Sequence, residues 1–122
     1  MPRRRKAVLA ILVALYATPV LAGDLVGNVA ALAPETKSFL VRALIDEHVL
    51  AAEVNANDNE QIATAVADYY LKHKDEFRRD GDETTTVDMV ICLLAERGHA
   101  VGQLMNGSLR GFCQDNLKSA LR

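Results

Sequence analysis

From residue 34 onward, hydrophobic residues recur at three- and four-residue intervals between polar stretches, which predicts a succession of amphipathic helices. The first helix is expected from Pro34 to about Val54, because proline is tolerated in a first turn, where its missing N–H has no partner. Residues 23–33 contain two glycines and a weak apolar rhythm, so they are interpreted as a lead-in or a short helical turn. The apolar face of the first helix consists of Val41, Leu44, Ile45, Val49 and Ala52.

The stretch between the first and second helices is rich in Asn and Asp, whose side chains bond to their own backbone and favour turns. A second helix begins there, since Asn57 lies three residues before Glu60 and Asp58 three before Gln61, and either pair resembles a capping box. The pattern ends where Gly81 supplies a backbone shape that other residues resist. The apolar positions of this helix are Ile62, Ala65, Val66, Tyr69, Tyr70 and Phe77.

The pattern of Thr85–Arg97 predicts a third helix, capped by a threonine and closed by Gly98 in a left-handed conformation. Its β-branched residues also permit a strand. The last segment, 101–121, is interpreted as one kinked helix or two short ones, because Gly107 and Gly111 interrupt its apolar repeat.

These segments indicate an all-α protein, a small bundle of four to five helices, because the chain shows no alternating strand pattern, sustained heptads or internal repeat. Short connections imply mostly antiparallel neighbours. Residues 23–122 are enough for a single helical domain with a modest core.

Residues 1–22 are predicted to be a signal peptide that is cleaved after Ala22. A basic cluster at residues 2–6 precedes an apolar run at residues 7–17, and small residues stand before the cleavage site. The alternative is an uncleaved anchor. The apolar run is broken by Thr18 and Pro19, however, and is shorter than the roughly 20 residues of a spanning helix, so no stable membrane insertion is expected after cleavage.

Charge narrows the choice of partner once the leader is set aside. Four of the 14 Lys and Arg residues lie in the leader, which leaves 10 against 16 Asp and Glu, a net charge of about −6. Nucleic acid and anionic lipid each require a basic face, so neither is expected as the main partner. A protein partner, if charged, is expected to be basic.

An exported chain meets oxidants, so Cys92 and Cys113 are predicted to form a disulfide that ties the third helix to the last segment. Closing a loop between cysteines 21 positions apart stabilises the fold by roughly 3 kcal/mol. The alternative is two buried free thiols. No CxxC spacing is present, which argues against a redox or metal-binding pair.

Metal, cofactor and catalytic motifs are not found. His48, His73 and His99 are interpreted as surface residues, because none is paired with another ligand at metal-binding spacing. The acidic turns at 55–59 and 80–84 alternate like calcium loops but lack the sixth-position glycine and the glutamate at position twelve. A serine between two glycines near residue 108 does not have the GxSxG spacing. We therefore expect no cofactor and no enzymatic activity.

The stretch from Gln61 to Gly98 resembles the helical pair that closes the Tai-type immunity proteins of type VI secretion. The resemblance rests on Gln61-Ile62, on Val66–Leu71 followed by Lys72-His73, and on Ile91–Ala95 after a threonine-capped helix start. It covers about a third of the chain, and the early cysteines of the family are absent. The resemblance implies a small exported bacterial helical protein that binds and blocks a cell-wall amidase delivered by a rival.

The sequence thus favours a periplasmic, or alternatively extracellular, helical protein that acts by protein binding, such as an inhibitor or immunity protein of a cell-wall enzyme. A periplasmic stress or chaperone-like protein that loosens when its carboxyl groups are protonated is the alternative, followed by an enzyme with an unrecognised site. The acidic turns and a tyrosine are the expected contacts, with one of two adjacent tyrosine rings packed inside and the other at a rim. The preferred alternative is that both tyrosines are partly buried core residues whose hydroxyls contact water. The candidate contact residues are Asp58, Glu60, Tyr69, Tyr70, Asp80, Asp82 and Glu83.

Overall fold

The computed structural model of the chain describes residues 25–101 and 105–119, so the predicted leader, residues 1–22, lies outside the described part. No strand occurs within those two ranges, which confirms the all-α prediction. The elements are a helical segment at 25–30, α2 (Pro34–Asp46), α3 (Asn59–Lys72), the 3-10 turn η1 (Lys74–Glu76), α4 (Thr86–Glu96) and α5 (Gly107–Asn116).

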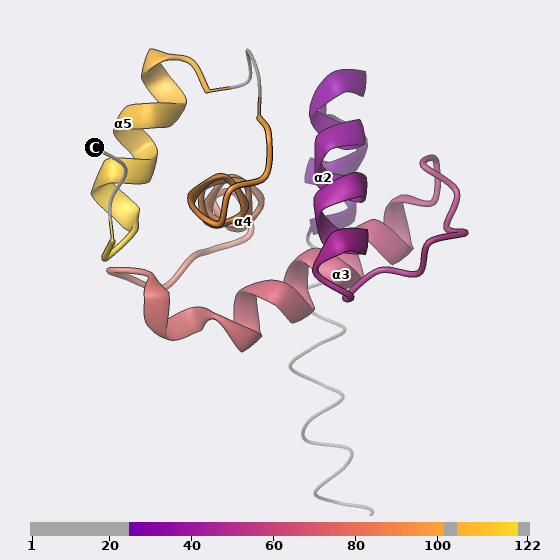
Figure 1. Ribbon diagram of the computed structural model, residues 1–122, viewed down its shortest axis with the longest axis horizontal. Coiled ribbons are helices and arrows are strands. Elements are labelled where there is room, and N and C mark those ends of the chain that lie inside the picture. Colours follow the sequence, from indigo (N-terminus) through magenta and orange to yellow (C-terminus); the bar gives the residue numbers. More distant parts are fainter. Residues whose placement is uncertain (1–24, 102–104, 120–122) are drawn as a thin grey trace, which may run out of the picture.

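Helix α4 occupies the centre of the bundle. Eight of its eleven residues are buried, and Val90, Cys92, Leu93 and Leu94 have no exposed area. Figure 1 shows α4 end-on between α2 and α5, with α3 running below it. Helix α4 packs against α3 and α5, whereas α2 packs against α3.

Helix α2 ends at Asp46, about two turns earlier than predicted. His48 adopts a left-handed conformation with φ of 63°, although it is not a glycine. The Val49 N–H donates to the Leu44 carbonyl at 3.1 Å and the His48 N–H to the Ile45 carbonyl at 3.0 Å, the two hydrogen bonds of a Schellman motif. The predicted C-terminus was wrong because the apolar spacing continues past a turn that only the backbone conformation reveals.

Helix α4 ends in the same motif, here around the predicted glycine. Gly98 has φ of 95°, and its N–H donates to the Ala95 carbonyl at 3.0 Å. The His99 N–H donates to the Leu94 carbonyl at 3.1 Å. The prediction that Gly98 closes this helix is confirmed.

Helix α3 begins at one of the two predicted caps. The Asp58 carboxylate accepts from the Gln61 N–H at 3.1 Å and from the Gln61 side-chain amide at 2.8 Å. The helix ends at Lys72, short of the predicted region, and Phe77 forms an isolated antiparallel bridge with Leu117 beyond α5. The chain between α3 and α4 is therefore attached to the end of α5.

Thr85 occupies the N-cap position of α4, as predicted, but its side chain makes no capping hydrogen bond, and the carboxylate at this helix start belongs to Asp82. One Asp82 carboxylate oxygen accepts from the N–H groups of Thr84 and Thr85, each at 3.0 Å, and from their hydroxyls at 2.8 and 3.0 Å. These hydrogen bonds, that of the Thr84 hydroxyl first, lower the pKa of Asp82 below its ordinary value.

Gly81 marks a close approach between the α3–α4 connection and the core. Its N–H donates to the Tyr70 hydroxyl at 2.7 Å. A Cβ atom at this position would lie 2.6 Å from the Met89 sulfur and 2.9 Å from the Thr86 hydroxyl. A larger residue at this position would therefore force the side chains of Met89 and Thr86 to shift.

Cys92 and Cys113 form the predicted disulfide, with an S–S distance of 2.07 Å and a Cα–Cα distance of 5.4 Å. Both residues are fully buried, and they join the middle of α4 to α5. Within the predicted last segment, α5 is a single short helix whose first turn is capped by the Asn106 side chain, which accepts from the Leu109 N–H at 3.0 Å.

Replacing both cysteines (Cys92→Ala with Cys113→Ala) should lower the free energy of unfolding by about 3 kcal/mol, because the unfolded chain regains the entropy of the open loop. Urea unfolding followed by far-UV circular dichroism measures this change. When reductant is present, the disulfide is reduced once the chain has unfolded, and the urea midpoint of the wild type should fall. The urea midpoint of the double variant should not change. Equal midpoints for oxidised wild type and double variant would contradict a stabilising role.

Candidate functional site

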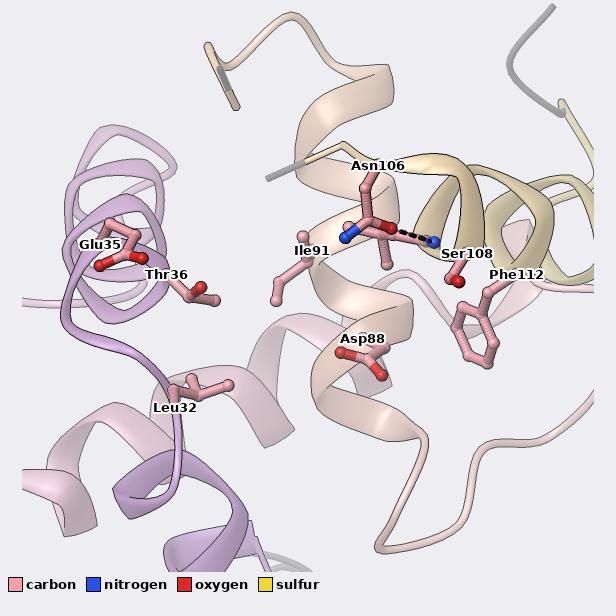
Figure 2. A pocket seen from close by; sticks show the side chains of 9 residues that line it. Leu32, Glu35, Thr36, Asp88, Ile91, Asn106, Ser108 and Phe112 are labelled. Carbon is pink, nitrogen blue, oxygen red and sulfur yellow. Dashed lines mark hydrogen bonds between the residues drawn. The ribbon is translucent and has the colours of Figure 1, made fainter. Parts of the chain in front are cut away.

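A groove of about 620 Å³ lies between α2 on one side and α4 and α5 on the other (Figure 2). Its lining combines four apolar residues, three neutral polar residues and two carboxylates. The lining residues are Leu32, Ile91, Leu109 and Phe112, then Thr36, Asn106 and Ser108, and finally Glu35 and Asp88.

The two carboxylates stand on opposite sides of the groove, Glu35 on α2 and Asp88 on α4 (Figure 2). Each lies in the first turn of its helix, where negative charge interacts favourably with the exposed N–H groups. Asp88 is the single charged residue of α4 before Glu96, so an otherwise apolar helix places one charge at the groove.

Within residues 25–101 and 105–119, neither Glu35 nor Asp88 has an ion pair or a hydrogen-bonding side chain. Asp88 is exposed, but partial desolvation of its carboxyl group still raises its pKa above the ordinary value. The groove therefore presents negative charge that no base in the described part neutralises.

A second polar group, the Glu47 cluster (Asp46, Glu47, Tyr69 and His99), lies where the ends of α2 and α4 meet α3. The His99 ring nitrogen Nε2 lies 2.7 Å from a Glu47 carboxylate oxygen, and Nδ1 lies 3.9 Å from Asp46. The Tyr69 hydroxyl donates to the other Glu47 oxygen at 3.4 Å. The Schellman motifs that end α2 and α4 bring Glu47 and His99 together.

A neighbouring ion pair extends this polar region. Arg97 donates to the Glu76 carboxylate, and the His73 ring nitrogen Nδ1 lies 2.9 Å from the same oxygen. The ring centroids of Tyr69 and His73 are 4.4 Å apart, so the two groups of polar residues are in contact.

The hydrogen bonds and charges of the Glu47 cluster indicate that it links the ends of α2 and α4 to α3 rather than forming a reactive centre. The hydrogen bond from His99 lowers the pKa of Glu47 despite partial desolvation. Burial, followed by the Glu47 charge, raises the pKa of Tyr69 well above its ordinary value, so its hydroxyl stays protonated and donates. In the described part of the chain, no three His, Cys, Asp or Glu side chains are arranged to hold a metal ion.

The interpretation of the histidines as simple surface residues holds for His48 but is wrong for His73 and His99. The side chains of His73 and His99 are only 16% and 18% exposed, and each is paired with a carboxylate. The i, i+3 spacing of His73 and Glu76 was a signal that the sequence contained, whereas His99 and Glu47 are brought together only by the fold.

The two tyrosines lie inside the protein, so the prediction that one ring sits at a rim is wrong. Tyr69 is 1% exposed and Tyr70 is 3% exposed. Their hydroxyls are engaged with Glu47 and with the Gly81 N–H, and the Tyr70 ring packs 5.4 Å from that of Phe77. Neither ring is available to a partner on this surface.

The acidic turns remain at the surface, but two of their carboxylates already have a structural task. Asp58 caps α3 and Asp82 caps the start of α4. Glu60 and Glu83 are exposed, and Asp80, with 81% of its side chain exposed, lies 3.6 Å from the Lys74 ammonium group. None of these predicted contact residues lines the groove between α2, α4 and α5. The carboxylates that do line it, Glu35 and Asp88, were not among the residues predicted from the sequence.

Comparison with protein-family models, with curated proteins and with solved structures finds no match. The resemblance to Tai-type immunity proteins therefore stays a prediction. Among the helices of the described ranges, none has both the length and the apolar character needed to cross a bilayer.

Substitution of Glu47 by Gln should destabilise the protein at neutral pH by about 1 kcal/mol or less, since it removes a charged acceptor that is still partly solvated. Because the folded-state pKa of Glu47 lies below its ordinary value of 4.5, the stabilisation is present above that pH and disappears as pH falls through the folded-state pKa. Urea midpoints of wild type and Glu47→Gln should therefore converge on acidification.

Asp46→Asn is the matched control, because Asp46 is adjacent in sequence, is 68% exposed and lies 3.9 Å from the His99 ring. Its unfolding midpoint at neutral pH should stay close to that of the wild type. A Glu47→Gln midpoint that differs from wild type by the same amount at every pH would show that the Glu47 charge does not contribute.

Proposed function

We propose that this chain is a small exported helical protein that binds another protein and inhibits it, with the groove between α2, α4 and α5 as its docking site. The observation that carries the proposal is a groove lined by apolar residues and by two carboxylates, Glu35 and Asp88, that have no base beside them in the described part. Such a surface favours a partner that brings both apolar area and positive charge.

Two further features support export and a basic partner. The Cys92–Cys113 disulfide fits a protein that folds in an oxidising compartment, for which we propose the periplasm. The predicted removal of residues 1–22 leaves a chain with about six more acidic than basic residues. Together with the resemblance to Tai-type immunity proteins, these features favour a cationic cell-wall hydrolase as the partner.

The chaperone-like alternative has less support from the structure. Among the described residues, Leu71 is the single large hydrophobic residue that is exposed, at 43%. Binding of unfolded clients would therefore require the bundle to open, whereas the groove is available in the folded protein.

The proposal is tested by capturing partners from the native cell envelope with the mature chain as bait, at low and at high salt. We expect a basic cell-wall hydrolase that is retained at low salt, is released more readily at high salt and loses activity at one equivalent of the protein. Unaltered hydrolase activity at a stoichiometric excess, or the absence of any specific partner, would contradict the proposal.

The intact mass of natively expressed material tests the compartment separately. We expect the mass of residues 23–122 less two hydrogens, because the leader is removed and the two thiols are joined. A mass that retains the leader, together with two thiols that react with alkylating reagent, would exclude export.

A further inference from the structure

The occupant of the groove can be inferred from the chemistry of its two walls. On α4 and α5, the groove is lined by the partly exposed side chains of Leu109 and Phe112, by the almost fully buried Ile91 and by the Asp88 carboxylate. On the opposite side, α2 presents Glu35 (Figure 2). A ligand that fits must therefore cover apolar surface and place positive charge beside a carboxylate.

The bases of the protein do not fill this role in the described part. Lys37, two residues after Glu35 on α2, donates to the Asn59 side chain at 3.0 Å, and so its ammonium group is directed to the start of α3. Among the described residues, no Lys or Arg lines the groove. The negative charge is thus open to a base from another molecule.

Size selects among the possible occupants. A volume of about 620 Å³ falls in the range of roughly 300–1,000 Å³ in which small ligands bind, so the groove has room for a few side chains of a partner. Lysine and arginine combine an apolar stem with a charged head, and arginine also stacks on aromatic rings such as that of Phe112. One basic side chain with an apolar neighbour matches both the charge and the lining.

We propose that the groove receives a lysine or arginine side chain of the partner protein, flanked by an apolar residue, with the cationic head at the Asp88 carboxylate and the apolar stem against the Phe112 ring. This inference rests on the proposed function and specifies its partner.

The probes are capped tripeptides, Leu-Arg-Leu and Leu-Lys-Leu, titrated into the isotope-labelled mature protein and followed by NMR. We expect saturable shifts of groove amides, including those of Asp88, Ile91 and Phe112. The matched peptide with norleucine in place of the base should bind at least tenfold more weakly, because it keeps the stem and removes the charge. Equal binding of the norleucine peptide, or no shifts at the groove, overturns the proposal.

Variants identify the carboxylates. Asp88→Asn should weaken binding of the basic peptides about tenfold, and Glu35→Gln should weaken it less, because Glu35 stands on the opposite side of the groove. The controls are Glu53→Gln and Asp115→Asn, two exposed carboxylates outside the groove that change the net charge equally. Equal weakening by groove and control variants would show a nonspecific charge effect and overturn the site.

Two outcomes separate this inference from the proposed function. If a captured hydrolase binds Asp88→Asn/Glu35→Gln as tightly as wild type, the function stands and the groove assignment fails. If basic peptides occupy the groove but no protein partner is captured, the recognition chemistry stands and the proposed function fails. Spermidine binding as tight as that of Leu-Arg-Leu would identify a site for free polycations and overturn the assignment to a protein side chain.

Discussion

The burial of α4 is the constraint on which the structure depends. Eight of its eleven residues are buried, and each large aliphatic side chain among them would cost about 1.5–3 kcal/mol to expose. Helix α3 covers one side and α5 another, where the Cys92–Cys113 bond holds the cover in place. Helix α2 packs on α3 instead, and the groove lies where α2 stands away from α4 and α5.

The turns at the helix ends contribute as much as the helices themselves to the positions of the polar side chains. The Schellman motifs around His48 and Gly98 reverse the chain after α2 and α4, and so they bring Glu47 against His99. The Tyr69 hydroxyl then has a partly buried acceptor in Glu47. The Glu47 cluster, whose polar groups are paired, is assembled by backbone turns. The groove, whose carboxylates have no base beside them in the described part, is left by incomplete helix packing.

Apolar spacing was sufficient to predict the helices, and the expectation of export was sufficient to pair the cysteines, because both depend on local or compositional information. The end of α2 could not be predicted, since a histidine occupies the left-handed position where glycine is expected. The cap by Asp82 was missed because three threonines follow it and also favour helix starts. The groove was hidden for another reason: Glu35 and Asp88 are 53 positions apart, and only the packing of α2 relative to α4 places them together.

Asp88 carries little of the stability that α4 requires, and this strengthens the case for a binding role. The start of α4 is already capped by Asp82, so the remaining benefit of a first-turn charge is roughly 0.3–1 kcal/mol. Partial desolvation acts against that benefit, because it raises the pKa of Asp88 and disfavours its charged form. A base supplied by a partner would remove this penalty on binding. A neutral side chain at position 88 would leave the folded chain about equally stable. The proposed basic partner therefore gives the Asp88 charge its clearest physical role.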